Sequence, residues 1–374
     1  MDLGLSEEQE LLKNTARDFL EKECPETLVR EMEEDEKGYS PDLWKKMAEQ
    51  GWQGLLIPEQ YGGAGFGYLD LIVLVEEFGR ALVPGPFIST QVGGVIPLLE
   101  GGTDEQKQQY LPRIASGEQI WTLAFTEPSA RFDAEGVSLE IKEDGNDVIL
   151  NGTKLFVRDA NVADYMTVVG RKPGTKGEDG IMLVIVDAKT SGISQTQLKT
   201  IASDKQAEVK FENVRVPKAN IIPGGWDLFR KIQRKATVLE CAYLVGLAQM
   251  DFEISVQYAK DRIQFGRPIG SFQAIQHKAA DMVTDVDGSR FIMYRAAWSV
   301  DQDEADADLN VNMAKAWVSE ATRRVVAHGQ QIHGGIGFTK DYKIQLYFRR
   351  QKAAELAWGD SDYHRELVAE GLGV

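Results

Sequence analysis

The spacing of hydrophobic residues changes twice along the chain of 374 residues, and these changes divide it into three regions. Up to about residue 118, apolar side chains recur every three to four positions, which predicts amphipathic helices. Alternation with a period of two follows up to about residue 224 and predicts strands. The helical period then returns and persists. We therefore expect an N-terminal α-helical domain over 1–118, a middle β domain over 119–224 and a C-terminal helical bundle domain over 225–374.

Helix-start signals support the helical interpretation of the first region. Ser6 with Gln9 fits a capping box ahead of an apolar stripe. Ser40 directly before Pro41 fits a second start, because proline suits the first helical turn. Thr103 fits the N-cap of another helix. We therefore expect several helices joined by loops in this region.

The middle region predicts a small antiparallel, barrel-like β unit. The stretch "SLEIKEDGNDVILNG" is typical of two strands around a tight turn. Three further stretches have the composition or the alternation of strands. They cover residues 164–171, 181–188 and 207–217.

The last region predicts four long helices. An apolar-striped stretch runs over residues 229–266, and three further helical stretches follow near 272–303, 309–333 and 341–356. Because the connections between them are short, we expect an antiparallel four-helix bundle. The predicted fold class is therefore mainly α with a small antiparallel β domain in the middle.

Composition and charge exclude several classes of protein. The formal net charge of −16 disfavours a nucleic-acid partner or an anionic membrane surface. No stretch predicts a secretory signal or membrane insertion. The two isolated cysteines make no disulfide framework, and Cys241 lies in an apolar helical run that predicts a packed core thiol. No ligand spacing among the histidines predicts a metal site. We expect a soluble, cytoplasmic protein.

Four stretches, in this order and spacing, resemble the acyl-CoA dehydrogenase superfamily of FAD-dependent flavoproteins. They are "LAFTEPSA" at 123–130, "LNGTKLFVRDANVAD" at 150–164, "DRIQFGRPIGSFQAIQHKAADM" at 261–282 and "QIHGGIGFTKDY" at 331–342. The resemblance covers nearly the whole chain. It implies FAD as cofactor, an acyl-CoA thioester as substrate, an electron-transferring flavoprotein as partner and an oligomer, typically a tetramer built as a dimer of dimers.

The resemblance also implies which residues meet the flavin ring. Phe125 and Thr126 match positions at the isoalloxazine, and Phe156 matches a position that packs on its face. Arg158 stands where many members have a threonine that donates to flavin N5. Two alternatives remain open for Arg158. If its side chain faces the flavin, the cation should stabilise reduced, anionic flavin; otherwise the side chain turns outward and only the backbone meets the ring.

A second set of residues matches positions that reach the FAD of a neighbouring subunit. One group meets the flavin diphosphate and its surroundings, with Arg262 as the partner of the diphosphate, and the other meets the adenosine part, where paired glycines allow close approach of the backbone. These residues are Arg262, Phe265, Gln273, Gln331, Gly334 and Gly335.

The chain departs from the family pattern at the expected catalytic positions. Most members carry a glutamate base in a "YEGT" stretch, and here that stretch is "AWGD", with Trp358 at the glutamate position. A second group of members keeps the glutamate early in the long helix, where this chain has Ala236. Glu240, one turn further along that helix, is the first candidate base, because a lone carboxylate in an apolar stripe requires a partner or a function. Asp360 is the second candidate.

Another departure lies in the motif "TEPxAGSD", which here reads "TEPSARFD". Arg131 and Phe132 replace a small residue and a serine that contact CoA or the flavin in the family. Polar residues of "FISTQVGG", namely Ser89, Thr90 and Gln91, are candidates for the lining of the acyl pocket, and Trp358 is a candidate for its wall.

Three functions remain open at this point. The first is α,β-dehydrogenation of an acyl-CoA with a polar, branched or cyclic acyl group. The second is a base-less subunit of a hetero-oligomeric acyl-CoA dehydrogenase, instead of a homo-oligomer. The third is other flavin chemistry on an acyl-CoA, such as enoyl-CoA reduction, elimination or oxygenation.

Overall fold

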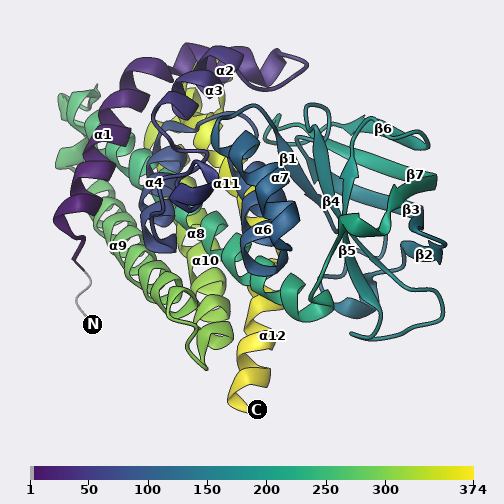
Figure 1. Ribbon diagram of the computed structural model, residues 1–374. Helices are drawn as coiled ribbons and strands as arrows, with labels where there is room; N and C mark the ends of the chain where they lie inside the picture. The colour runs from purple at the N-terminus through teal and green to yellow at the C-terminus, as the bar shows by residue number, and fades with distance from the viewer. Residues whose placement is uncertain (1–3) are drawn as a thin grey trace. The chain divides into compact units, whose positions relative to one another are not determined.

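Two units make up the protein in this computed structural model, which describes residues 4–374 (Figure 1). Unit 1 takes in the described residues up to Val29, then Tyr68–Val83 and Ala236–Val374. Unit 2 takes in Arg30–Gly67 and Pro84–Lys235. The helices of the N-terminal region are thus shared between the two units, and the three domain boundaries drawn from the sequence remain a prediction.

Unit 2 contains an eight-stranded sheet with the order β6-β7-β3-β2-β4-β5-β8, and β1 pairs with β4. Alternate side chains of these strands form a buried apolar core, as the period of two predicts. Most neighbours are antiparallel, but β1 runs parallel to β4, and β2 meets β4 in parallel at one residue pair. The strands are β1 Trp121–Ala124, β2 Glu140–Asp144, β3 Asp147–Arg158, β4 Tyr165–Arg171, β5 Ile181–Asp187, β6 Ile193–Leu198, β7 Gln206–Pro217 and β8 Ile221–Ile222.

Short helices complete unit 2. Ser40 caps α3, with Pro41 at its start, and Thr103 forms a capping box at the start of α7, so both predicted helix starts are confirmed. Between α5 and α6 one turn is a π-helix, over Gln91–Val95. The α-helices that lie wholly in this unit are α3 Pro41–Glu49, α5 Phe87–Thr90, α6 Ile96–Gly101 and α7 Asp104–Ala115. Helix α2 (Glu26–Glu34) crosses the boundary between the units.

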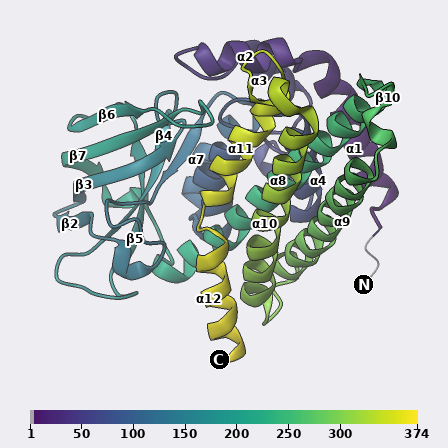
Figure 2. The same ribbon diagram turned by 180° about the vertical axis from the view of Figure 1, so that it is seen from behind.

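Unit 1 is a helical bundle (Figure 2). Helix α10 packs against α9, α11 and α12, and α4 packs against α1 and α9. The long helix α8 begins in unit 2 and continues through unit 1. The helices are α1 Glu7–Glu23, α4 Tyr68–Ala81, α8 Gly225–Asp261, α9 Gln273–Asp301, α10 Ala307–His333, α11 Ile344–Leu356 and α12 Ser361–Leu372.

Two glycines fix the crossing of α4 and α8. A Cβ atom on Gly246 would lie 1.8 Å from the carbonyl oxygen of Glu76, and one on Gly79 would lie 2.0 Å from that of Tyr243. Only glycine allows the two helices to approach this closely. The crossing holds the middle of α8 in a defined position. Glu240 lies on the same helix, between one and two turns before Gly246.

The predicted fold class is confirmed: a mainly α protein with a mostly antiparallel sheet in the middle of the chain. The capping box at Ser6 is present at the start of α1. The sequence interpretation did not include α12, the last helix. Among the described residues, no helix combines the length and the apolar character that a membrane crossing requires.

Candidate active site

A buried lysine organises the turn that follows β1. Lys154 lies on β3, is fully buried, and donates hydrogen bonds to the carbonyl oxygen of Phe125 (2.9 Å) and to Oε1 of Glu127 (2.6 Å). The amide nitrogen of Leu155, the next residue, donates to the carbonyl oxygen of Thr126 (2.8 Å). Strand β3 therefore holds both carbonyl groups of the dipeptide that the sequence placed at the flavin.

This arrangement leaves hydrogen-bond donors available at Thr126. A trans peptide unit is planar, so its N–H points opposite to its C=O. Because Lys154 holds the carbonyl of Phe125, the N–H of Thr126 points away from Lys154. Among the described residues, neither this N–H nor the Thr126 hydroxyl has a hydrogen-bond partner. Neutral donors of this kind suit the pyrimidine and N5 edge of a flavin, so this turn fits the cofactor that the sequence implies.

The charge of Lys154 is balanced inside unit 2. Glu127 also accepts hydrogen bonds from the amide nitrogens of Ser138 and Leu139, each 2.9 Å long. Burial lowers the pKa of Lys154 to about 8, although the Glu127 carboxylate opposes that change. Burial acts to raise the pKa of Glu127, but the Lys154 charge and the hydrogen bonds outweigh it and the pKa is lowered. We infer an ion pair at neutral pH.

Phe156 presents an open ring next to this turn. Its φ is 54°, a strained value for an aromatic residue, and the pairing of β3 with β7 shifts register between Lys154 and Val157. The ring is 54% exposed, whereas Val157 is buried in the sheet core. Arg158 follows Val157, and its carbonyl oxygen accepts a hydrogen bond from the Thr122 hydroxyl (2.6 Å). The exposed ring fits the predicted stacking on a flavin, while the direction of the Arg158 side chain stays open.

The structure brings a predicted pocket residue to the end of this strand. Ser89 donates a hydrogen bond to the carboxylate of Asp159, the residue after Arg158. Asp159 has a left-handed backbone, with φ at 54°, and its amide nitrogen donates to the carbonyl oxygen of Lys205 (2.8 Å). Burial raises the pKa of Asp159 to about 6, which the hydrogen bond from Ser89 counteracts in part. The sequence interpretation did not single out Asp159.

The other two predicted pocket residues are fully buried and hydrogen-bonded within unit 2. The Thr90 hydroxyl accepts from the amide nitrogen of Trp121 (3.2 Å), and Nε2 of Gln91 donates to the carbonyl oxygen of Gln53 (3.0 Å). The side-chain oxygens of Gln91 and Gln53 have no partner among the described residues. Two buried hydrogen-bond acceptors thus remain unsatisfied near the predicted acyl pocket.

The residues predicted to reach a neighbouring FAD lie in unit 1 and are largely exposed. Arg262 follows the end of α8, and no hydrogen bond or ion pair joins its side chain to the described residues. Phe265, with φ at 55°, is 92% exposed at the tip of a hairpin formed by β9 (Ile263–Gln264) and β10 (Arg267–Pro268). Gln273 begins α9 and is also exposed. An unpaired arginine beside a protruding ring suits a diphosphate-containing ligand.

The residues predicted to meet the adenosine part of FAD lie at the end of α10. Gln331 is exposed near the end of that helix. Gly334 has φ at 61°, and a Cβ atom on Gly334 or Gly335 would meet nothing within 4 Å. The surface beside these glycines is therefore open to a ligand, as their predicted role requires.

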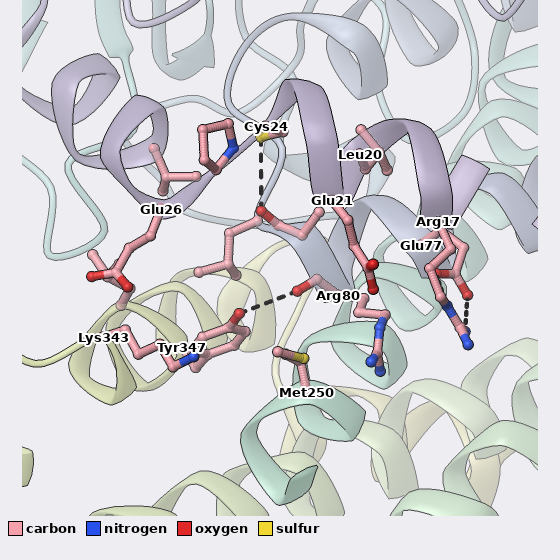
Figure 3. Close-up of a pocket in the computed structure, with 15 residues that line it drawn as sticks. Arg17, Leu20, Glu21, Cys24, Glu26, Glu77, Arg80, Met250, Lys343 and Tyr347 are labelled. Atoms are coloured by element: carbon pink, nitrogen blue, oxygen red, sulfur yellow. Dashed lines mark hydrogen bonds and ion pairs between the residues drawn. The ribbon is translucent and has the colours of Figure 1, made fainter. Parts of the chain in front are cut away.

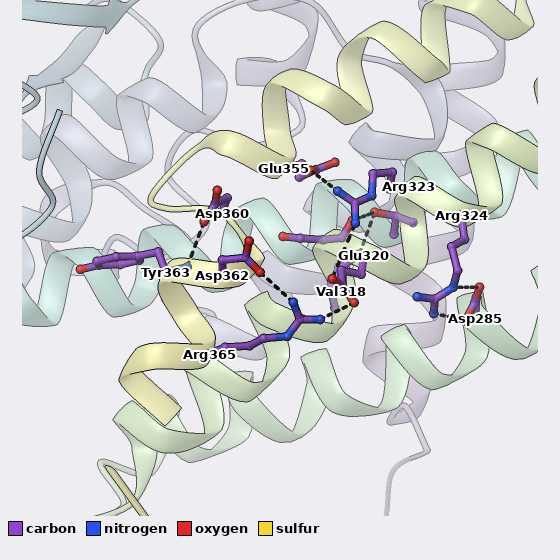
Figure 4. Close-up of polar contacts among 12 residues, drawn as sticks. Asp285, Val318, Glu320, Arg323, Arg324, Glu355, Asp360, Asp362, Tyr363 and Arg365 are labelled. Carbon is purple, nitrogen blue, oxygen red and sulfur yellow. Dashed lines mark hydrogen bonds and ion pairs between the residues drawn. The ribbon is translucent and has the colours of Figure 1, made fainter. Parts of the chain in front are cut away.

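Asp360 has a structural role. Its carboxylate accepts a hydrogen bond from the amide nitrogen of Tyr363 (2.9 Å) and caps the N-terminus of α12 (Figure 4). Trp358, two residues earlier, is half-buried and has φ at 63°. The contribution of either residue to catalysis stays a prediction.

Glu240 is 1% exposed on α8. Its neighbour Cys241 is a buried free thiol, as the sequence predicts, and burial raises the pKa of that thiol to about 12. The charge of Lys315 opposes this rise in the pKa of the thiol, and the charge of Glu240 adds to it. The role of Glu240 as a base stays a prediction.

A separate cavity of about 200 Å³ lies within unit 1 (Figure 3). Its lining includes none of the residues predicted from the sequence. Two of its arginines are already paired in bidentate fashion: Arg17 with Glu77, at 3.0 and 2.6 Å, and Arg80 with Glu253. We assign it no catalytic role. Among residues 4–374 there is also no group of side chains that could hold a metal ion.

Comparison with known proteins identifies the family. Models of the N-terminal, middle and C-terminal domains of acyl-CoA dehydrogenases match residues 6–118, 122–214 and 224–373. The chain belongs to the acyl-CoA dehydrogenase family. It is therefore a flavin oxidoreductase that acts on CH–CH donors, and FAD is the cofactor of the family. The resemblance drawn from the four sequence stretches is confirmed at this level.

Three relatives show the range of this acyl-CoA dehydrogenase family. The 3-(aryl)acrylate reductase of Clostridium sporogenes is 35% identical over 98% of this chain and 99% of its own. The CarC subunit of the caffeyl-CoA reductase-Etf complex of Acetobacterium woodii is 32% identical over 98% of each chain. A chain in the ChsE4-ChsE5 complex of Mycobacterium tuberculosis matches with a TM-score of 0.92 and 27% identity, over 100% of this chain and 99% of that one.

The sequence interpretation missed two residues that hold strand β3 and the turn beside it, where the residues predicted to meet the flavin lie. Lys154 stands at an inward position of an alternating strand, where a charge is out of pattern, and this signal was available in the sequence. Asp159 gave no comparable signal, because its hydrogen-bond partner Ser89 lies 70 residues away along the chain.

Proposed function

We propose that the chain catalyses FAD-dependent oxidoreduction of the Cα–Cβ bond of an acyl-CoA with a polar, branched or cyclic acyl group. The observation that carries this proposal is the turn at Phe125 and Thr126. Lys154 and Leu155 hold its carbonyl groups, so its N–H and hydroxyl donors remain available beside the exposed ring of Phe156. Bound FAD would supply the hydride acceptor at N5.

Glu240 is the proposed base. Removal of the α-proton of a thioester requires a carboxylate whose charged form is not overly stabilised by water. Glu240 is withdrawn from water in the bundle, on an otherwise apolar stretch of α8. Asp360 is the weaker candidate because its carboxylate already caps α12.

Two features support a polar acyl group. The Ser89 hydroxyl donates a hydrogen bond to Asp159, so the lone pairs of its oxygen are available to a donor on a ligand. The side-chain oxygen of Gln91 is buried and has no partner among residues 4–374. An acyl group that carries a hydroxyl or amino donor would satisfy acceptors that a plain hydrocarbon chain leaves unpaired.

The test is anaerobic bleaching of the bound flavin by a panel of acyl-CoA thioesters with linear, branched, cyclic and hydroxylated acyl groups. We expect at least one thioester to reduce the flavin in the wild-type protein. Glu240→Gln should slow this reduction by at least about a hundredfold, and Asp360→Asn is the matched control that should not. If Glu240→Gln bleaches as fast as the wild type, Glu240 is not the base.

A second possible function is that of a base-less subunit in a mixed oligomer. It is favoured by a contrast between the residues that would reach a neighbour's FAD and the positions that usually carry the base. The residues that would reach a neighbour's FAD are exposed, whereas the usual base positions hold Trp358 and Ala236, and the "TEPSARFD" stretch carries Arg131 paired with Asp133 at 2.7 Å. On this reading the chain completes the FAD site of a related catalytic subunit. The relative in the ChsE4-ChsE5 complex supports such a mixed assembly.

Co-expression with related chains from the same genome separates the two functions. A homo-oligomer that holds one FAD per chain and is bleached by an acyl-CoA excludes the mixed assembly. A stable complex in which only the partner's chains retain FAD, and in which Arg262→Ala in this chain releases that FAD, establishes it.

The direction of the reaction and the electron partner belong to the same proposal. The CarC relative is a subunit of a complex with Etf, and the Clostridium relative is a 3-(aryl)acrylate reductase. We therefore propose an electron-transferring flavoprotein as the redox partner. Electron transfer from bleached protein to that flavoprotein tests the partner, and reoxidation by an enoyl-CoA tests the reductive direction. Rapid reoxidation by oxygen would instead favour oxygenation.

A further inference from the structure

The joint between α11 and α12 has an unusual backbone. It covers residues 357–360 and contains two successive left-handed residues, with φ at 63° for Trp358 and 103° for Gly359. A left-handed conformation is unfavourable for a residue with a bulky side chain, because its Cβ approaches the backbone too closely. A conformation of this kind persists only where its surroundings hold it.

Helix α10 holds the joint on its upstream side. Lys315 is fully buried, and its Nζ donates to the carbonyl oxygen of Glu355 (2.6 Å) and more weakly to that of Ala354 (3.4 Å). These carbonyls belong to the last turn of α11. The carbonyl of Ala354 also accepts from the amide nitrogen of Ala357 (3.3 Å), whereas that of Glu355 lies where helical partners are lacking. A cation at a helix C-terminus also complements the helix dipole. The end of α11 is therefore tied to α10 just before Trp358.

His364 holds the joint on its downstream side. It lies on α12 and is 3% exposed. Its Nε2 lies 3.0 Å from the carbonyl oxygen of Trp358, and its Nδ1 lies 2.8 Å from the side-chain oxygen Oδ1 of Asn312 on α10. Further along, Arg365 joins Glu320 of α10 by an ion pair (Figure 4). The joint is thus fixed at both ends to one helix.

The protonation of His364 follows from its partners. Burial, together with the nearby charge of Lys315, lowers its pKa to about 3, so the ring is neutral at pH 7. A neutral ring carries one proton. The carbonyl of Trp358 can only accept, so Nε2 must carry that proton and donate it. Nδ1 is then an acceptor, so the Asn312 amide is turned over, with its NH2 group in place of Oδ1 facing Nδ1, because an oxygen cannot donate to it.

We propose that His364, oriented by Asn312, is a positioning residue that holds Trp358 as a fixed wall of the acyl site and thereby sets acyl-group selectivity. This inference rests on the proposed function, in which Trp358 stands at the position of the family base. A carbonyl held by His364 fixes the peptide plane after Trp358, and the left-handed φ fixes the direction of the Cα–Cβ bond that carries the indole. An indole at that position excludes bulk by shape and performs no proton transfer.

The test compares His364→Leu with His364→Gln. Leucine removes the donor, whereas glutamine places an amide NH2 near the position of Nε2 and can donate to Trp358. In His364→Leu we expect the KM for the preferred acyl-CoA to rise about tenfold, with a smaller change in kcat and weaker discrimination between acyl groups of different size. His364→Gln should restore both KM and discrimination. Equal KM values in wild type and His364→Leu, or failure of the rescue, would overturn the proposal.

Hydrogen exchange separates this inference from the proposed function. We expect the amides of residues 357–361 to exchange about tenfold faster in His364→Leu than in wild type and His364→Gln, while amides in the middle of α9 stay unchanged. If no acyl-CoA bleaches the wild-type flavin, the proposed function fails. Hydrogen exchange alone then tests whether His364 holds residues 357–361 in place. Unchanged exchange at 357–361 in His364→Leu would refute it.

Discussion

Ser89 donates a hydrogen bond to the carboxylate of Asp159 and so joins the candidate acyl pocket to the end of strand β3. Burial raises the pKa of Asp159 from its ordinary value of 3.8 to about 6. Between these two values the folded protein binds more protons at this site than the unfolded chain does. The contribution of Asp159 to stability is therefore most favourable below about pH 4 and is lost as the pH rises towards 6.

We predict that Asp159→Asn stabilises the protein at pH 7 by about 3 kcal/mol, because asparagine accepts the Ser89 hydrogen bond, tolerates a left-handed backbone and carries no charge to bury. The advantage should shrink below pH 6 and vanish near pH 4. Urea unfolding at pH 4, 5 and 7 measures it. Glu178→Gln, which changes an exposed carboxylate in the same unit, is the control and should show no such dependence. A variant that is no more stable than wild type at pH 7 would show that the Asp159 pKa is not raised.

Lys154→Met should destabilise the protein by about 3–5 kcal/mol, because it leaves the buried Glu127 carboxylate without its cation. It also frees the carbonyl of Phe125, so we expect the purified protein to contain less FAD. Urea unfolding measures the first effect and the flavin absorbance per chain the second.

Two further variants sharpen the Lys154 experiment. Lys210→Met breaks an exposed pair with Glu208 on the neighbouring strand β7 and should cost less than about 1 kcal/mol. The double change Lys154→Met with Glu127→Gln should recover part of the lost stability, because no unpaired charge then remains buried. Equal losses in the Lys154 and Lys210 variants would contradict the buried-pair interpretation.

The sequence predicted the elements whose period is unambiguous, such as α8 and the strands β2, β3, β4, β5 and β7, but not β1, β6 and β8. It predicted the family through four local stretches. It could not predict features that depend on contacts between distant segments. The hydrogen bond between Ser89 and Asp159 joins two segments that are far apart in the chain, and the parallel pairing of β1 with β4 depends on a crossover that local alternation does not record. Asp360 caps α12, and the sequence alone does not separate this role from catalysis, because cap and base require the same carboxylate.

The two possible roles of Asp360 predict different behaviour for two variants. Asparagine caps a helix as well as aspartate does, whereas alanine does not. If Asp360 is only a cap, Asp360→Asn should match the wild type in both stability and flavin bleaching, and Asp360→Ala should lose about 1 kcal/mol of stability. Thermal unfolding and anaerobic bleaching by the best acyl-CoA measure the two properties. Loss of bleaching in Asp360→Asn at unchanged stability would make Asp360 a catalytic residue.

His364 should make the protein sensitive to acid. Burial, with the charge of Lys315, lowers its pKa to about 3, whereas the unfolded chain protonates this ring near pH 6.5. Between these values the unfolded chain binds more protons, so the free energy of unfolding falls as the pH drops below 6.5, by about 1.4 kcal/mol per pH unit from this one site. Glutamine keeps the donor to Trp358 and does not titrate. The stability difference between His364→Gln and wild type should therefore shift by about 2 kcal/mol in favour of the variant between pH 7 and pH 5, measured by urea unfolding at both pH values. His277→Gln, which replaces an exposed histidine on α9, is the matched control and should leave the pH dependence unchanged. If His364→Gln loses stability with acid as steeply as the wild type, the ring titrates in the folded protein and cannot be the fixed neutral donor to Trp358.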